Sequence, residues 1–260
     1  MATARSAPPL SCYVLHAWDW SESSLILDLF TRPQGRVVAV AKGAKKPTSA
    51  LRPLLMPFHA LAVWLARPGA DDGEVRAVRA VEWGGSAALP GTALMSGFYL
   101  NELLLKGLPR QDAHPALFDA YADTLAALAA ASGGGGDEAA ALRAFELVLL
   151  RELGLLPDLG VVTLTADAVE PGGAYLLQAE QGLAPAAGGI EGRAWTGLEA
   201  ALGHRDADGG IAALRAACRP LAAALRPPLR ALVQYHLASG PLRTRQLGLE
   251  LQRLADPAPR

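Results

Sequence analysis

The alternation of hydrophobic and polar positions changes near residue 91 and divides the chain into two parts. Between residues 12 and 83, short apolar, β-branched and aromatic runs alternate with turn residues. Runs of this length with a period of two are typical of half-buried strands. The pattern predicts five strands, at residues 13–18, 25–31, 36–41, 59–66 and 75–83.

Five strands with short connections predict a closed barrel over residues 1–84. Turn residues at 33–35 and 68–73 supply two of the connections. A small barrel of the oligonucleotide-binding (OB) type removes the exposed edges that an open sheet of five strands would leave. We therefore expect this kind of barrel at the N-terminal end of the chain.

From residue 91 onward the apolar positions follow helical spacing. One run contains Leu94, Phe98 and Leu103, and the next contains Leu117 and Tyr121. These spacings predict amphipathic helices that pack against each other. A third helix is expected over residues 139–153, with Asp137 as its N-cap, after a flexible connection made by the glycines at 133–136.

Residues 158–193 return to a period of two and predict a small β insertion. Its hairpin would pair residues 161–164 with residues 174–178 across the turn at 170–173. Beyond it, helices are expected at 211–225 and 229–238, interrupted at Pro220 and at Pro227-Pro228. The expected fold class is α+β: the barrel, then a helical domain of residues 85–157 and 194–260 that contains the insertion.

Composition favours a protein of the cytosol. The chain has no stretch of about 18 uncharged apolar residues and no secretory leader at its N-terminal end, which argues against a membrane span. The cysteines, Cys12 and Cys218, have no CxxC spacing, so we expect both to be reduced.

The formal net charge of −1 conceals a segregation of charge. Residues 1–84 hold 10 bases and 7 acids, residues 85–208 hold 6 and 16, and residues 209–260 hold 8 and 2. Residues 29–70 carry seven bases and no acid. Because salt screens charges beyond about 8–10 Å, a polyanion responds to such a patch and not to the total. Nucleic acid is therefore the first partner to consider.

The loop at residues 41–47 is the sharpest feature of this basic window. It carries Lys42, Lys45 and Lys46 around Gly43, and ammonium groups that neutralise phosphates make binding depend steeply on salt. The alternative is a solvated lysine-rich turn, which the lack of nearby acids disfavours because exposed turns usually mix signs. The predicted DNA-binding cations are Arg32, Arg36, Lys42, Lys45, Lys46 and Arg52.

Aromatic faces on which bases stack are the second requirement for binding single strands. Trp18 and Trp20 flank Asp19 at a strand end, so one of the two is the better candidate. Phe30, Phe58 and Trp64 also fall in the barrel. Any of the five can instead belong to the core, which is the usual place of an aromatic side chain.

A second basic face is possible near the C-terminal end. Four arginines are spaced by 4, 7 and 4 residues, which places them within about 60° of one another on an unbroken helix. The proline pair makes that continuity doubtful, and arginines that only solubilise a helix surface explain the pattern equally well. The four are Arg215, Arg219, Arg226 and Arg230.

The sequence offers little for catalysis. The five histidines are scattered, with no HExxH, no metal-ligand spacing and no nucleophile turn. The acids of the helical part lie on separate helical faces, so a solvated or partner-facing surface is favoured over a catalytic pair. We therefore expect a protein that is not an enzyme and holds no cofactor.

Several runs together resemble the bacterial recombination mediator family RecO. The resemblance extends from about residue 13 to residue 254. Its most specific pieces are Ala41-Lys42-Gly43-Ala44 and Asn101-Glu102-Leu103-Leu104; further pieces lie at residues 20–25, 97–100, 117–121, 143–147 and 153–159.

The resemblance implies an OB barrel, a helical domain and a non-enzymatic role in recombinational repair. Such proteins bind single- and double-stranded DNA, anneal complementary strands, contact the acidic C-terminal tail of single-stranded-DNA-binding protein (SSB) and act with RecR to load recombinase. It also implies a cytoplasmic, nucleoid-associated location.

The resemblance places the site for the SSB tail in the helical domain. Arg143 matches the arginine of the family motif, and Leu147 is expected to supply apolar surface beside it. The alternative is that Arg143 pairs with Glu146 or Asp137 on its own helix.

The sequence departs from the family in one respect. Many members carry four zinc-binding cysteines after the run at residues 153–157, whereas residues 158–189 contain none. We therefore expect no zinc and an insertion held by ordinary packing.

A rival interpretation makes the chain a protein adaptor. In it the helical part docks a partner and the basic barrel is incidental; an enzyme with an unrecognised site is a third and weaker alternative, because no catalytic constellation is visible.

Overall fold

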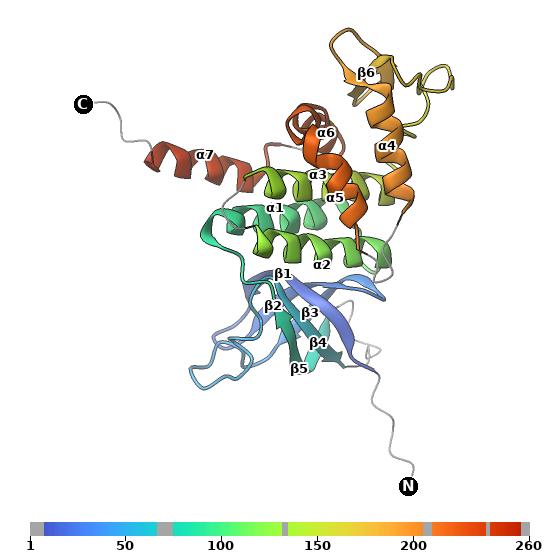
Figure 1. Ribbon diagram of the computed structural model, residues 1–260. Helices are drawn as coiled ribbons and strands as arrows, with labels where there is room; N and C mark the ends of the chain where they lie inside the picture. Colours follow the sequence, from blue (N-terminus) through green and yellow to red (C-terminus); the bar gives the residue numbers. More distant parts are fainter. Residues whose placement is uncertain (1–7, 67–74, 132–134, 205–209, 238–239, 256–260) are drawn as a thin grey trace, which may run out of the picture. The chain divides into compact units, whose positions relative to one another are not determined.

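The computed structural model describes residues 8–66, 75–131, 135–204, 210–237 and 240–255. The chain forms two compact units (Figure 1). One consists of Met1–Ala88 and Leu108–Phe118, and the other of Leu89–Gly107 and Asp119–Arg260. The predicted turn at 68–73 and the glycines at 133 and 134 lie outside the described residues.

The first unit contains a closed five-stranded barrel. Its strand order is β1-β2-β3-β5-β4, with β4 returning to pair with β1 and with β3 and β5 parallel. The alternating pattern predicted each strand to within a few residues, and the α+β class with an OB-type barrel is confirmed. The strands are β1 (Leu10–Asp19), β2 (Leu25–Thr31), β3 (Gly35–Ala41), β4 (His59–Leu65) and β5 (Arg76–Ser86).

Alternate side chains of these strands form the barrel interior. Val14, Leu27, Leu29 and Val63 are among its buried members. The predicted turn between β2 and β3 is present: the Thr31 hydroxyl donates to the Gly35 carbonyl at 2.9 Å and accepts from the Gln34 N–H at 3.2 Å. Gly35 has a φ of +64°, which glycine adopts without steric cost.

The segment Leu108–Phe118 packs on the outer face of the barrel although it follows the first helix in sequence. The ring of Phe118 lies 5.4 Å from that of Tyr13 and 5.3 Å from that of Phe30, measured between centroids. The Gln111 N–H donates to the Arg36 carbonyl at 2.9 Å. The rings of Tyr13 on β1 and Phe30 on β2, which point away from the barrel interior, are thereby buried as well.

The second unit is mainly helical. Helix α3 packs against α5 and α6, and α7 lies beside α1 (Figure 1). Helix α3 is the central element, because Ala141, Ala144, Phe145 and Val148 on it are fully buried. The helices are α1 (Gly91–Gly107), α2 (Pro115–Ala130), α3 (Gly135–Glu152), α4 (Gly192–Gly203), α5 (Ala212–Cys218), the 3₁₀ turn η1 (Arg219–Leu221), α6 (Ala222–Leu237) and α7 (Arg243–Ala255).

Two helix predictions are wrong. Asp137 is not the N-cap of α3, because the helix already begins at Gly135 and Asp137 lies in its first turn. The pair Pro227-Pro228 does not interrupt α6, which runs through it. The carbonyls that lose their partners belong to Ala223 and Ala224; both residues are exposed, so water can bind these groups. The expected break at Pro220 is present as η1.

The β insertion has a different pairing from the predicted one. Its strands are β6 (Ala174–Gln178), β7 (Gly182–Pro185) and β8 (Ile190–Glu191), in the order β7-β6-β8. Residues 161–164 do not form a strand: Val161 makes an isolated bridge with Ala168, and Thr163 bonds the backbone of Leu183. The run therefore lies outside the sheet, and its predicted pairing with residues 174–178 is wrong, whereas the small β insertion itself is confirmed, with β6 and β7 as its hairpin.

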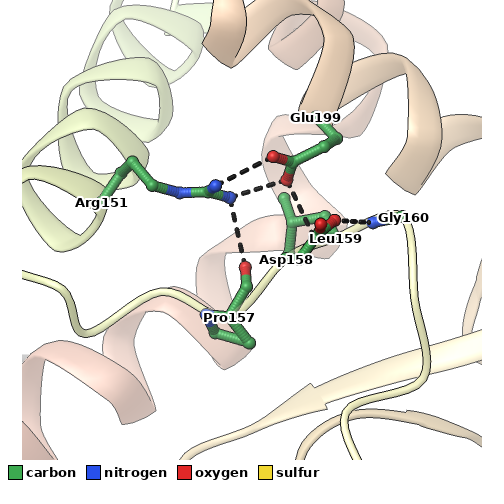
Figure 2. Close-up of polar contacts among 6 residues, drawn as sticks. All are labelled: Arg151, Pro157, Asp158, Leu159, Gly160 and Glu199. Carbon is green, nitrogen blue, oxygen red and sulfur yellow. Dashed lines mark hydrogen bonds and ion pairs between the residues drawn. The ribbon is translucent and has the colours of Figure 1, made fainter. Parts of the chain in front are cut away.

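A polar clamp fixes the base of this insertion (Figure 2). The guanidinium of Arg151 on α3 donates to both carboxylate oxygens of Glu199 on α4, at 2.9 and 2.6 Å, and to the Pro157 carbonyl at 3.2 Å. Glu199 also accepts the Leu159 N–H at 2.8 Å. Packing alone was expected here, and the clamp was missed.

Candidate functional site

A hollow at the rim of the barrel brings together the strongest DNA-binding candidates. The loop that follows β1 supplies Trp20 and three serines, and the loop that follows β3 supplies Lys42 and Lys46. Trp20 is 65% exposed, so the indole face is available to a ligand. The lining residues are Trp20, Ser21, Ser23, Ser24, Val40, Lys42, Gly43 and Lys46.

Lys45 fastens these two loops together. Its backbone N–H donates to the Ser23 carbonyl at 2.9 Å, and its ammonium donates to the Ser21 carbonyl at 3.2 Å. The same ammonium lies 2.8 Å from a carboxylate oxygen of Asp19. Gly43 turns the loop with a φ of +72°. Lys45 thus shapes the hollow, whereas the charge that faces it comes from Lys42 and Lys46.

The arrangement suits a strand of nucleic acid. Two ammonium groups can neutralise backbone phosphates, serine hydroxyls can bond phosphate or sugar oxygens, and an exposed indole can stack on a base. Lys42 and Lys46 form no ion pair with any residue that the structure describes.

The remaining barrel candidates lie apart from the hollow. Arg36 is engaged with the buried carboxylate of Asp28 and is not available to phosphates. Arg32 and Arg52 are exposed on other loops. Trp18 is 44% exposed and packs edge-on against His16, with ring centroids 4.4 Å apart, outside the lining of the hollow.

The other barrel aromatics are wholly or partly covered by neighbouring residues. Phe30 and Phe58 are buried, and Trp64 is half-buried.

The bases of residues 29–70 are not all free of acidic partners in the folded structure. Asp28 and Asp19 lie just outside residues 29–70, yet they pair with Arg36 and Lys45 inside it.

The second unit contains a pocket of about 210 Å³ between α1, α3, α6 and the first turn of α7. Its apolar lining comes from Met95, Leu142, Val233 and Leu242. Four arginines surround this lining, one from α3, two from α6 and one from α7: Arg143, Arg226, Arg230 and Arg245. An apolar cavity with a cationic rim fits an anion that carries an apolar side chain.

Helix α7 is held in place by Glu102 of α1. The carboxylate accepts the N–H groups of Arg243 and Thr244, at 2.8 and 2.9 Å, and the Thr244 hydroxyl at 2.7 Å. Burial disfavours the charge of Glu102, but these hydrogen bonds outweigh it and lower the pKa of the carboxyl. Glu102 therefore caps α7 and fixes the wall that carries Arg245.

Arg143 both lines the pocket and pairs with an acid of its own helix. It is only 8% exposed, and its Nη2 lies 2.8 Å from Oε1 of Glu146, which is 1% exposed. Desolvation raises the pKa of the Glu146 carboxyl, although Arg143, Tyr99 and Arg226 favour its charge. The alternative interpretation, a pair with Glu146 on the same helix, is therefore observed, and the role in binding a peptide tail stays a prediction. Leu147 is fully buried and is not part of the lining.

The four arginines of the predicted second basic face are not on one helix. Arg215 pairs with Asp123 of α2, and Arg219 lies 2.8 Å from Asp137 of α3. Arg226 and Arg230 instead lie on α6, in the same pocket as Arg143. The structure therefore separates the set into two ion-paired arginines and two pocket arginines.

Two kinds of feature are absent from the described ranges. No helix there is long and apolar enough to cross a membrane. In that same part of the chain, no three or more histidines, cysteines or acids are grouped so that they could hold a metal ion.

The fold defines the class of protein, an OB-type barrel followed by a helical unit, and comparisons with known proteins specify the family. The family description "Recombination protein O N terminal" matches residues 10–83, and "Recombination protein O C terminal" matches residues 90–246. The chain therefore belongs to the RecO family.

Similar full-length proteins carry the name DNA repair protein RecO. That of Acidovorax ebreus (strain TPSY) is 46% identical over 260 residues, covering 96% of this chain and 99% of the relative. That of Verminephrobacter eiseniae (strain EF01-2) is 47% identical over 261 residues, covering 98% and 100%. That of Paracidovorax citrulli (strain AAC00-1) is 48% identical over 262 residues. These relatives support a role in DNA repair.

Proposed function

We propose that this protein is a non-enzymatic recombination mediator that binds single- and double-stranded DNA and anneals complementary strands. The observation that carries the proposal is the hollow lined by the exposed indole of Trp20 together with Lys42 and Lys46, which form no ion pair with the described part of the chain. It works in the cytoplasm in association with the nucleoid, and with RecR it helps to load recombinase onto DNA coated with SSB.

The chemistry of the hollow favours annealing over tight storage of a strand. Contacts to phosphate lower the repulsion between two strands and carry no sequence information. Shallow electrostatic contacts also release the strand once base pairing has formed. No nucleotide hydrolysis and no cofactor is needed for this cycle.

The test is the salt dependence of binding to a labelled oligonucleotide. The double variant Lys42→Ala/Lys46→Ala should lower affinity about tenfold or more at about 0.1 M salt, and should lower the slope of log K against log salt by about 1.4 for a single strand. Lys106→Ala, an exposed lysine at the end of α1, is the matched control and should change neither.

The same variants distinguish the mediator from a protein adaptor. A mediator loses annealing of two fluorescently labelled complementary strands together with affinity. Wild-type protein that binds no oligonucleotide at low salt, or a double variant with an unchanged slope, would favour the adaptor or move the DNA site elsewhere.

The pocket in the helical unit supports a second element of the proposal. Its apolar lining and its arginines match an acidic peptide that ends in an apolar residue with a free carboxylate. The C-terminal tail of SSB has this chemistry. Arg143 is the proposed anchor of the carboxylate, with Met95, Leu142 and Val233 around the apolar side chain.

A further inference from the structure

The ion pair between Arg143 and Glu146 is bonded through a single contact. Arginine and carboxylate often meet through two parallel hydrogen bonds, which use both oxygens. Here only Nη2 and Oε1 are in contact, at 2.8 Å. Nε of Arg143 and Oε2 of Glu146 are buried and have no hydrogen-bond partner within the described structure. The pair therefore leaves one donor on the arginine and one acceptor on the carboxylate without a hydrogen bond in the described structure.

Tyr99 is a second donor to the same carboxylate oxygen. Its hydroxyl, from α1, donates to Oε1 of Glu146 at 2.7 Å, the oxygen that already accepts Arg143. Arg226 of α6 also favours the charge of this carboxylate. Glu146 thus accepts hydrogen bonds from residues of two helices, and it contacts only one nitrogen of the Arg143 guanidinium.

We propose that Glu146 is a built-in competitor for Arg143, which keeps the pocket's hold on a ligand carboxylate weak and reversible. This inference rests on the proposed function of the pocket. An incoming carboxylate must share the guanidinium with Glu146 and approaches a fixed negative charge beneath it. Both effects reduce its net attraction to Arg143.

Tyr99 has the opposite influence in this scheme. The Tyr99 hydroxyl donates to Oε1 and so stabilises the Glu146 carboxylate independently of Arg143. This hydrogen bond weakens the interaction of Glu146 with the arginine. Removing the charge of Glu146 should therefore strengthen ligand binding. Removing the hydroxyl of Tyr99 should weaken it, because Glu146 then depends on Arg143 alone.

The experiment compares wild-type protein, Glu146→Gln and Tyr99→Phe in fluorescence anisotropy with a labelled acidic peptide that ends in leucine and a free carboxylate. Glu146→Gln keeps the shape and the acceptor oxygen, and should bind about threefold to tenfold more tightly. Tyr99→Phe should bind about threefold more weakly. The matched probe is the same peptide with a C-terminal amide, on which Glu146→Gln should have a much smaller effect.

Three results would overturn the inference. The first is an unchanged or weakened affinity in Glu146→Gln. The second is an unchanged or strengthened affinity in Tyr99→Phe, which remains decisive if Glu146→Gln fails to fold. The third is an equal gain for the amide peptide, which would mean that Glu146 acts on the general charge of the pocket.

The proposed function fails in a distinguishable way. If wild-type protein binds neither peptide, the tail pocket and the competitor are both refuted. If wild-type protein binds the carboxylate peptide through Arg143 and Glu146→Gln has no effect, only the competitor is refuted. Thermal melting and oligonucleotide affinity of each variant identify losses that come from misfolding.

Discussion

Arg36 on β3 and Asp28 on β2 form a two-point ion pair inside the barrel unit. Nε lies 3.1 Å from Oδ1, and Nη2 lies 2.7 Å from Oδ2. Asp28 is only 1% exposed, and Arg36 also donates to the Leu108 carbonyl at 2.6 Å. The pair therefore joins two strands to the segment that covers them, and its role is structural.

Replacing Asp28 by Ala should destabilise the protein by about 3–5 kcal/mol, because a nearly buried guanidinium loses its partner. Urea unfolding followed by circular dichroism measures the loss. The double variant Asp28→Leu/Arg36→Met removes both charges and should recover most of the stability while retaining oligonucleotide binding. If that double variant folds but loses DNA affinity, the result would show that Arg36 contributes to DNA binding.

Trp20 and Trp18 should differ in their effect on DNA binding. Trp20→Ala should weaken binding of a single-stranded oligonucleotide by about 1–3 kcal/mol, the usual range for the loss of a stacked base. Trp18→Ala is the matched control, because Trp18 is similarly exposed but lies outside the hollow. Quenching of tryptophan fluorescence by oligonucleotide should disappear largely with Trp20; equal effects of the two variants would contradict the proposed site.

Arg143→Ala should separate peptide binding from DNA binding. We expect the acidic SSB-tail peptide to lose about 1.5–3 kcal/mol, as for a charged hydrogen bond. Binding of naked oligonucleotide should stay within a factor of about two, because screening confines the charge effect to the pocket. Fluorescence anisotropy with both ligands measures the two values, and Arg219→Ala provides an exposed arginine for comparison. Equal losses for both ligands would mean that Arg143 stabilises the fold or only adds to the general positive charge of the protein.

The clamp at the base of the insertion should be measurable without any ligand. Glu199→Gln removes the charge that Arg151 and the Leu159 N–H share, and should cost about 1–3 kcal/mol of stability. Hydrogen exchange at the amides of residues 158–160 should accelerate first. Glu191→Gln is the control, since its ion pair with Arg193 is exposed and contributes little. Unchanged exchange at the Leu159 amide would show that packing alone holds the insertion.

The sequence predicted the barrel well because strand alternation is a local property. Inward positions such as Val14, Leu27 and Val63 are apolar, and the turn at 33–35 carries its own signal, so little long-range information was needed. The insertion was harder. The pattern paired residues 174–178 with residues 161–164, whereas the observed pairing with β7 depends on Gly182 and on contacts of Thr163 that the linear sequence does not reveal.

The site residues were predicted less well than the fold, for a related reason. Counting charge along a window overlooked Asp28, which lies eight residues from Arg36 in sequence but pairs with it across two strands. Helical geometry grouped Arg226 and Arg230 with Arg215, whereas the packing of four helices groups them with Arg143. Tyr99 and Glu102 fall in pieces of the family resemblance, but their roles could not be predicted, because these roles arise only when α1 meets α3 and α7.

The capping of α7 by Glu102 has a consequence for synthesis and truncation of the chain. The pocket wall made by Leu242, Thr244 and Arg245 is translated long after α1 and α3 have left the ribosome. A chain that ends before α7 lacks this wall, so the space between α1, α3 and α6 is left open on that side. We therefore expect any ligand of the pocket to bind only to chains that extend through α7.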